Sequence, residues 1–238
     1  YLEGDGDFRS EEVKKLRDEA DIIVTNPPFS LFREFVAWIM EANKEFLIIG
    51  NINAITYKEI FPLIKNNKIW IGNRFNQRVN GKNMTFWVPD CYELTGTELY
   101  VENGKKYISV AGTGWFTNID HGRRHQPLQL MSMADNLKFS KHKEIKENGY
   151  QKYDNYDAIE IPFTDAIPND YDGIMGVPIT FLSKYCPEQF EIVGMAAGNS
   201  RATGFFFDVP YTPHSLDRGG CGVVNNKRQY ARFLIKKR

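Results

Sequence analysis

Short apolar runs alternate with amphipathic stretches along the first part of the chain. The runs at residues 22–24, 46–50 and 68–72 have the length of strands and predict three of them, the first a buried strand of a parallel sheet. Between the first two runs, residues 31–40 repeat apolar side chains at helical spacing, which predicts a helix with one apolar face. This succession is typical of an α/β protein with a parallel sheet.

Helix-start signals predict two further helices. Ser10 is a good N-cap, and the two glutamates after it suit the first turn of a helix that would run to about residue 20. Thr56 and Glu59 have the spacing of a capping box. Because proline cannot sit in a helix interior without breaking it, Pro62 predicts that the helix after this box is short or kinked.

Two apolar stretches in the middle of the chain predict an antiparallel closure of the sheet. Residues 83–89 and 106–118 are expected as strands, forming a hairpin joined through Gly96 or Gly104. Four aromatic side chains lie on them, and each is a candidate to stack on a bound base or simply to pack in the core: Phe86, Trp87, Trp115 and Phe116.

The amino-acid composition changes near residue 120. Basic and polar residues become frequent, and residues 153–182 are rich in Tyr, Asp and Pro with little periodicity, which predicts loops and short strands. Strands are expected again at residues 190–195 and 232–235. A domain boundary is therefore predicted between residues 1–120 and 121–238.

The first strand ends in an unusual turn made of Asn26, Pro27, Pro28 and Phe29. A residue before proline is pushed out of the helical region, and each proline fixes its own φ, so the chain must leave the strand in a stiff, extended form. Ligands of open α/β sheets bind just beyond the carboxyl ends of strands. These four residues are therefore the candidate catalytic site.

The groups in this turn suit a planar amino group. The Asn26 side chain and the Pro27 carbonyl both offer an accepting oxygen, and Phe29 offers a flat ring. Two hydrogen bonds from an aromatic amine to those oxygens would leave its nitrogen lone pair freer to attack an electrophile. The alternative is a plain strand-ending turn with a buried Phe, since Asn-Pro is a common turn dipeptide. The order strand, Asn-Pro-Pro-aromatic, helix favours the functional interpretation.

Residues 25–30, Thr-Asn-Pro-Pro-Phe-Ser, resemble the catalytic motif of S-adenosylmethionine-dependent amino-methyltransferases. The motif alone is shared by several such families. Further blocks make the resemblance to the EcoRI-type adenine-specific DNA methyltransferases more specific, and together they cover most of the chain: residues 5–12, 46–57, 115–122, 153–160 and 167–173.

The resemblance implies a Rossmann-like class I methyltransferase sheet, partial and mixed, followed by a target-recognition region. It also implies that S-adenosylmethionine is the methyl donor, with Asp7 accepting from its adenine amino group and Phe8 covering the ring. An exposed Gly/Asp turn is an equally weighted alternative for these two residues. The glycine loop for the methionine end of the cofactor would lie upstream of residue 1. Residues 110–114 match that loop only in part, and residues 219–222 are a second glycine cluster.

Charge limits how such a protein could hold DNA. Lysine and arginine together number 30, as do aspartate and glutamate, so the formal net charge is zero. A general basic surplus, the usual mark of phosphate binding, is lacking, and contacts must be concentrated locally. The candidates are Arg123, Arg124, Lys227 and Arg228, although each could equally belong to a solvated face.

Other sequence features narrow the protein class. Three isolated cysteines, an odd number, favour reduced thiols and an intracellular location. No apolar run in the sequence approaches the roughly 20 residues of a membrane helix. His121 and His125 have no third ligand at recognisable spacing, so no metal site is predicted. The polar start without Met predicts that the sequence begins within a domain.

These observations lead to one interpretation with two rivals. The chain is interpreted as the catalytic half of the methyltransferase domain (residues 1–120) and the target-recognition region (121–238) of a DNA adenine-N6 methyltransferase. Such an enzyme would act as a cytoplasmic monomer on double-stranded DNA, in a bacterial or phage restriction-modification system. One rival keeps the chemistry but methylates RNA bases or protein glutamine. The other is a non-catalytic DNA-binding fragment.

Overall fold

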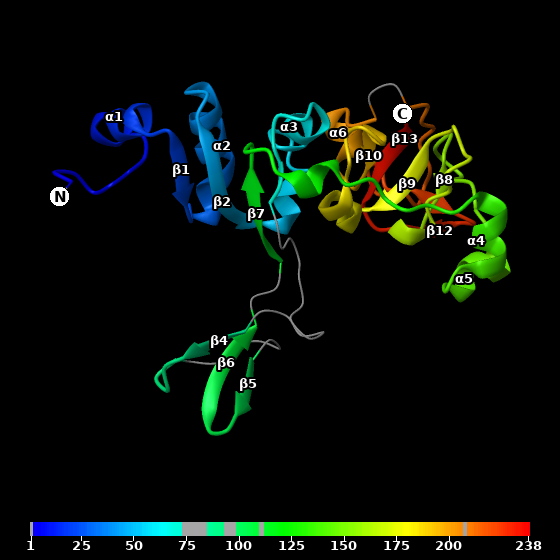
Figure 1. Ribbon diagram of the computed structural model, residues 1–238, viewed down its shortest axis with the longest axis horizontal. Coiled ribbons are helices and arrows are strands. Elements are labelled where there is room, and N and C mark those ends of the chain that lie inside the picture. Colours follow the sequence, from blue (N-terminus) through cyan, green and yellow to red (C-terminus); the bar gives the residue numbers. More distant parts are fainter. Residues whose placement is uncertain (1, 73–84, 93–98, 110–111, 207–208) are drawn as a thin grey trace. The chain divides into compact units, whose positions relative to one another are not determined.

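The computed structural model describes residues 2–72, 85–92, 99–109, 112–206 and 209–238 (Figure 1). It divides into two compact units. Unit 1 contains residues 1–61 and 69–119, and unit 2 contains residues 62–68 and 120–238. Among the described residues, no helix is both long and apolar enough to cross a bilayer.

A mixed four-stranded sheet forms the centre of unit 1, in the order β1-β2-β7-β3. β1 and β2 are parallel, with Thr25 opposite Ile48. β7 runs antiparallel to both β2 and β3. The protein is therefore mixed α/β, as expected, and the strands predicted from the first three apolar runs are confirmed: β1 (Ile22–Thr25), β2 (Glu45–Asn51) and β3 (Trp70–Ile71), with β7 at Thr113–Thr117.

Two helices of unit 1 were predicted correctly, α1 from its start signal and α2 from its apolar spacing. In α1 (Glu11–Glu19) the Ser10 hydroxyl accepts a hydrogen bond from the Val13 amide, which is the predicted cap. α2 (Phe32–Glu41) begins after the short 3-10 helix η1 (Phe29–Leu31). Its apolar face is buried as the helical spacing predicted: Phe32, Phe35, Val36, Trp38 and Ile39.

The predicted capping box is wrong, although the predicted short helix is present. Thr56 closes a 3-10 helix, η2 (Ile52–Thr56), and its hydroxyl donates to the Asn53 carbonyl. The following helix, α3 (Phe61–Lys65), begins only beside Pro62 and is five residues long. Proline is tolerated there because the first-turn amides of a helix have no intrahelical partner to lose.

β1 is an exposed strand rather than the buried one predicted. Ile22 is 48% exposed and Val24 is 65% exposed. Among the described residues β1 is hydrogen-bonded to β2 alone, so it forms an edge of the sheet. An apolar run does not reveal whether both sides of a strand have neighbours, and that is why the prediction failed.

The region predicted as a hairpin is divided between two sheets. Residues 106–118 form two strands, β6 (Lys105–Ser109) and β7, and only β7 joins the central sheet. β6 pairs with β4 (Thr85–Val88), as expected for that part, and with β5 (Leu99–Glu102). Gly104 lies in the tight turn between β5 and β6 rather than between the two predicted strands, whereas Gly96 lies outside the described residues.

Unit 2 has its own four-stranded sheet, in the order β10-β13-β9-β8. The two predicted strands are confirmed, and they pair with each other antiparallel. Fully buried aromatic rings of Phe181, Phe190 and Phe233 fill its core. The strands of this sheet are β8 (Ile159–Glu160), β9 (Met175–Pro178), β10 (Phe190–Ala196) and β13 (Arg232–Lys237). A separate two-stranded sheet consists of β11 (Val223–Val224) and β12 (Lys227–Arg228).

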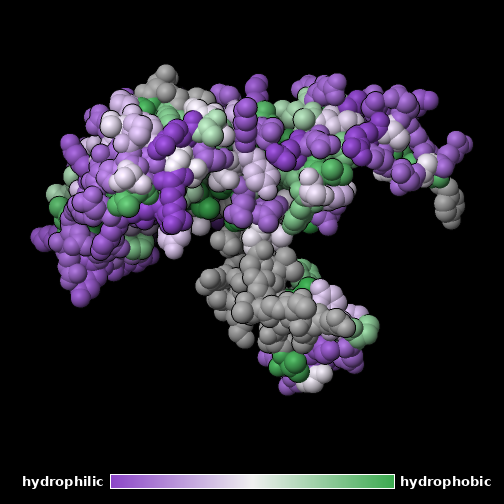
Figure 2. All heavy atoms as spheres, turned by 180° about the vertical axis from the view of Figure 1, so that it is seen from behind, coloured by the Kyte–Doolittle hydropathy of each residue, from purple (hydrophilic) through white to green (hydrophobic). Residues whose placement is uncertain are grey.

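Short helices connect the strands of unit 2. The polar stretch near residues 133–148 forms two of them, and this end of the unit is almost wholly hydrophilic on the face that Figure 2 shows. They are α4 (Met133–Phe139) and α5 (Lys143–Asn148). The others are η3 (Gly122–His125), η4 (Thr164–Ala166), η5 (Ile179–Lys184) and α6 (Ser200–Thr203).

Candidate functional site

The candidate catalytic turn lies where β1 ends. The strand stops at Thr25, residues 26–28 have no regular secondary structure, and η1 begins at Phe29. Pro27 is buried and anchors the turn, whereas Asn26 is exposed and the Phe29 ring is 40% exposed. The exposed ring contradicts the alternative of a plain turn with a buried Phe. Among the described residues the Asn26 carboxamide has no hydrogen-bond partner, so both its oxygen and its amino group remain available.

Close packing behind the turn fixes its position. The Phe32 ring lies against Gly50 of β2, and a Cβ atom at Gly50 would come within 2.4 Å of that ring. Phe32 also meets Phe116 of β7 edge-on, with ring centroids 5.0 Å apart. Glycine at position 50 therefore lets the helix after the turn approach the sheet closely.

Other polar and aromatic groups of unit 1 are partly engaged elsewhere. β1 and β2 are parallel, so Asn51 lies at the same sheet edge as the turn. Its side-chain oxygen already accepts from the Asn53 amide at 2.8 Å, which caps η2. Phe116, one candidate for stacking on a base, is fully buried and serves the core instead. Phe86 and Trp87 are exposed, on the separate sheet that contains β4.

Phe8 lines a small cavity beside β1. The ring is 9% exposed and meets Phe35 and Trp38 edge-on, with centroids 5.2 and 5.5 Å away. A cavity of about 350 Å³ lies against it, bounded also by Leu16 and Thr25. These mostly apolar walls fit one end of a cofactor, the aromatic ring of an adenine, and Phe8 is not the exposed turn residue of the alternative interpretation.

Asp7 directly precedes Phe8 in the chain and has a lowered pKa. Two hydrogen bonds from the Arg9 guanidinium, at 2.6 and 2.9 Å, lower the pKa of the Asp7 carboxyl to about 2. A carboxylate has several lone pairs, so this pairing leaves it able to accept another hydrogen bond. Asp7 and Phe8 therefore fit the adenine end of S-adenosylmethionine.

The four candidate DNA-contacting residues differ in their surroundings. The Arg124 guanidinium is only 11% exposed and donates to Asn67 at 2.7 Å, with Asp120 at 3.5 Å. These contacts hold it inside unit 2, whereas Arg123 is exposed. Lys227 and Arg228 are exposed along β12. Arg124 is therefore engaged within unit 2, whereas the other three candidates are exposed.

A histidine bridge in unit 2 was not foreseen from the sequence. The two ring nitrogens of His125 lie 2.9 Å from Asp120 and 2.7 Å from Glu188. Hydrogen bonds that the protonated ring donates to both carboxylates, with Asp120 the stronger influence, raise the pKa of His125. A long-range partner such as Glu188 has no local sequence signal. In the described parts of the chain no group of three or more potential ligands could hold a metal ion.

Comparison with known proteins is decisive for the family. A family model described as "Adenine-specific methyltransferase EcoRI" matches residues 1–238. The chain belongs to the EcoRI family of adenine-specific methyltransferases. No solved structure matches it.

Curated relatives of this family member are type II methyltransferases by name. Over 196 residues the chain is 50% identical to "Type II methyltransferase M.EcoRI" of Escherichia coli, covering 82% of the chain and 56% of that relative. It is 40% identical to M.MgeORF184P of Mycoplasma genitalium, over 99% of the chain and 70% of the relative. It is 37% identical to M.MpnI of Mycoplasma pneumoniae, over 100% of the chain and 70% of that relative.

Proposed function

We propose that this chain provides the catalytic and target-recognition parts of a DNA adenine-N6 methyltransferase, the modification enzyme of a restriction-modification system. Family membership and the names of the relatives support the reaction class. The carrying observation is the Asn26 carboxamide, exposed and without an intramolecular partner among the described residues, at the carboxyl end of β1. We further propose that the sheet of unit 1 is part of a Rossmann-like class I methyltransferase sheet and that unit 2 contacts the target.

Each residue of the turn has a role in this proposal. The target adenine leaves the base stack, at a cost of a few kcal/mol. Its amino group donates one hydrogen to the Asn26 side-chain oxygen and the other to the Pro27 carbonyl, while Phe29 stacks on the ring. Pro28 keeps the turn stiff, so the two oxygens do not reorganise during the reaction.

The turn acts by position and by electrostatics. When both hydrogens of the adenine amino group are donated to these oxygens, the nitrogen lone pair is less delocalised into the adenine ring. The lone pair is then better placed to attack the methyl group. S-adenosylmethionine supplies the methyl group when bound, with Asp7 and Phe8 holding its adenine end. The same proposal makes the protein a cytoplasmic monomer that acts on double-stranded DNA.

The test uses the full-length protein with radiolabelled S-adenosylmethionine. Duplex DNA, structured RNA and a protein extract are offered separately, and the methylated product is identified by mass spectrometry. N6-methyladenine in DNA is the expected product. Label in an RNA base or in protein glutamine would support the rival substrates, and DNA binding without any transfer would support a non-catalytic module.

A further inference from the structure

The β11–β12 hairpin of unit 2 is rigid and exposes a polar tip. Asn225 and Asn226 form its two-residue turn, both with positive φ (50° and 58°), a conformation that Asn tolerates better than most residues. The side chain of Asn155, 2% exposed, holds the base of the hairpin by accepting from the Val223 amide and donating to the Cys221 carbonyl, each at 2.9 Å.

Hydrophobic and polar side chains are sharply divided along this hairpin. Val223 and Val224 are buried, whereas the turn and both residues of β12 are exposed. Just beyond it, the Tyr230 ring is 87% exposed. A two-stranded ribbon with amides in its turn and cations on its second strand suits the major groove of DNA, which admits such a ribbon between its phosphate rims.

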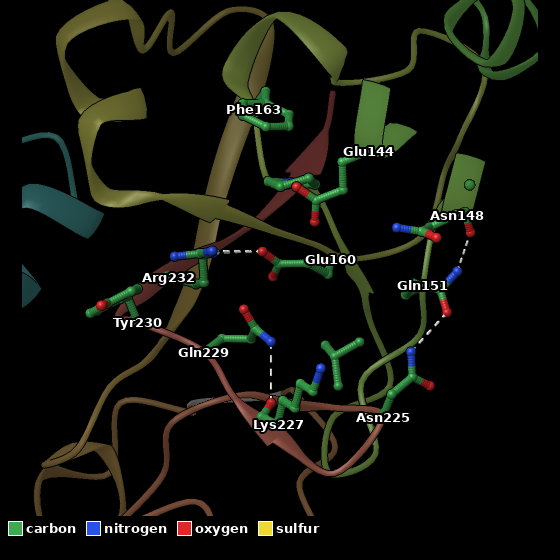
Figure 3. A pocket seen from close by; sticks show the side chains of 13 residues that line it. Glu144, Asn148, Gln151, Glu160, Phe163, Asn225, Lys227, Gln229, Tyr230 and Arg232 are labelled. Atoms are coloured by element: carbon green, nitrogen blue, oxygen red, sulfur yellow. Dashed lines mark hydrogen bonds and ion pairs between the residues drawn. The ribbon is translucent and has the colours of Figure 1, made fainter. Parts of the chain in front are cut away.

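A cavity of about 630 Å³ lies beside the hairpin. In Figure 3 the hairpin residues Asn225 and Lys227 line it on one side, and Glu144 and Asn148 of α5 line it on another. Its walls carry four carboxamides, each offering both a donor and an acceptor: Asn148, Gln151, Asn225 and Gln229.

Hydrogen bonds hold two of these amides in fixed orientations. The Asn225 amide donates to the Gln151 side-chain oxygen at 3.1 Å. The Gln229 amide donates to the Lys227 carbonyl at 3.2 Å, and Figure 3 shows its oxygen turned toward the Glu160–Arg232 pair. Fixed amides can discriminate between base edges, because Asn and Gln pair with adenine through one donor and one acceptor.

The charges around the cavity favour base edges over phosphate. Arg232 neutralises Glu160 on its wall, with two contacts at 2.7 and 2.9 Å, and the buried Tyr153 hydroxyl donates to the same carboxylate. Of the remaining charged residues that line it, Glu144 offsets Lys227. An anion would gain little here, whereas the uncharged rim of a base pair would meet donors and acceptors.

We propose that the β11–β12 hairpin enters the major groove of the substrate duplex and that Asn225 and Gln229 read base edges there. Lys227 and Arg228 then lie against the flanking phosphates. This assignment rests on the proposed function, and it names residues that determine the recognition sequence rather than the reaction.

The test compares full-length wild type with Asn225→Gly and Gln229→Ala on a random-sequence duplex library. Glycine keeps the positive φ of position 225 while removing its amide. Sequencing that detects N6-methyladenine gives the methylated motif. We expect each variant to relax the motif at one or two base positions, by roughly ten- to hundred-fold, while the other positions keep their preference. Thermal melting checks that each variant is folded.

Asn103→Gly is the matched control, since Asn103 also has a positive φ (52°) in a two-residue turn, but one that joins β5 and β6 and is not part of the hairpin. It should keep the wild-type motif. Gln229→Glu is a second test, because a carboxylate accepts from cytosine, so preference should move toward cytosine at the affected position.

The outcomes separate the two proposals. A wild type that methylates DNA, with variants that keep its motif, would overturn the hairpin assignment alone. Equal relaxation in Asn103→Gly would also overturn it, since the loss would then not depend on the hairpin. A wild type that methylates no DNA would overturn the proposed function, and this assignment with it.

Discussion

At the residue scale, the proposed chemistry depends on one carboxamide and its surroundings. The Asn26 oxygen is useful only because Pro27 is buried and Pro28 holds the chain extended, which together fix the position of a side chain that is itself exposed. Its contribution should therefore appear in the transition state and hardly at all in the affinity for DNA.

Asn26→Ala in the full-length enzyme tests this directly. Turnover should fall by roughly a hundred-fold or more, because the lost hydrogen bond acts on the reacting nitrogen. Affinity for DNA should stay within a few-fold, since phosphate contacts elsewhere dominate it. Single-turnover rates and equilibrium binding measure the two effects. Weakened binding with an unchanged kcat would show that Asn26 is not catalytic.

His125 gives unit 2 a pH-dependent contact. Its pKa is raised in the folded protein by Asp120 and Glu188. The bridge therefore contributes full stability below the unfolded pKa of about 6.5 and loses that contribution as pH rises through the folded pKa. His125→Gln should lower the urea midpoint more at pH 6 than at pH 9, in low salt. Equal losses at both pH values would contradict an ionic role.

The turn after β1, the candidate catalytic site, could be located from the sequence because its information is local. Two prolines, an amide and an aromatic ring directly after an apolar run predict a turn at the end of a strand. In the same way, Ser10 predicted the start of its helix from local sequence alone. The His125 bridge and the cavity by the β11–β12 hairpin could not be predicted. Each joins residues far apart in the sequence, such as Glu160 and Arg232, which no periodicity relates.

At the element scale, the approach of α2 to β2 positions the turn. Phe32 follows Phe29 by three residues and packs on a glycine in the neighbouring strand. Any atom added at Gly50 must push that ring, and with it the start of α2, away from the sheet.

Gly50→Ala should therefore disturb both stability and activity. A Cβ 2.4 Å from the Phe32 ring and 2.9 Å from Phe116 forces repacking, which costs about 1–3 kcal/mol. Turnover should fall more than cofactor affinity, because the turn moves. Denaturant unfolding and kinetics measure these effects. Gly122→Ala, where an added Cβ meets nothing within 4 Å, is the control, and an equal loss there would contradict the packing argument.

Strand positions were more predictable than strand neighbours. Local apolar runs located β1, β2 and β10 correctly. They could not show that β1 would be an edge, nor that residues 106–118 would divide at Gly112, whose φ is 74°. Sheet membership depends on contacts between distant segments, which an apolar run does not encode.

At the scale of the whole molecule, zero net charge requires that DNA contacts be local. If Lys227 and Arg228 both neutralise phosphates, replacing both with Ala should reduce the slope of log affinity against log salt by about 1.8, and Arg123→Ala should reduce it by about 0.9. Affinity should fall similarly on cognate and non-cognate duplexes. Fluorescence anisotropy across a salt series measures this.

A lysine that is already neutralised is the control for that series. Lys14 pairs with Glu11 at 2.7 Å, so Lys14→Ala should leave the salt slope unchanged. An unchanged slope in the Arg123 variant would assign that arginine to an ordinary solvated face. A loss confined to the cognate duplex would make the residue a base reader instead.

The polypeptide of residues 1–238 by itself should bind S-adenosylmethionine poorly. The proposed contacts within it are Asp7 and Phe8, and the chain spans 56% of the length of M.EcoRI. Titration calorimetry should show a Kd well above the micromolar range, with circular dichroism as the check on folding. Micromolar binding would revive residues 110–114, which lie partly outside the described residues, as a cofactor loop.

The exposed edge of β1 has a practical consequence for that polypeptide. In the part of the chain that the structure describes, no strand pairs with the outer side of β1, and Ile22 and Val24 are open to solvent. Such an edge is a template on which a second strand can add. Concentrated samples of residues 1–238 should therefore aggregate, with turbidity that rises over time. A lysine at position 24 would blunt the edge and keep the solution clear.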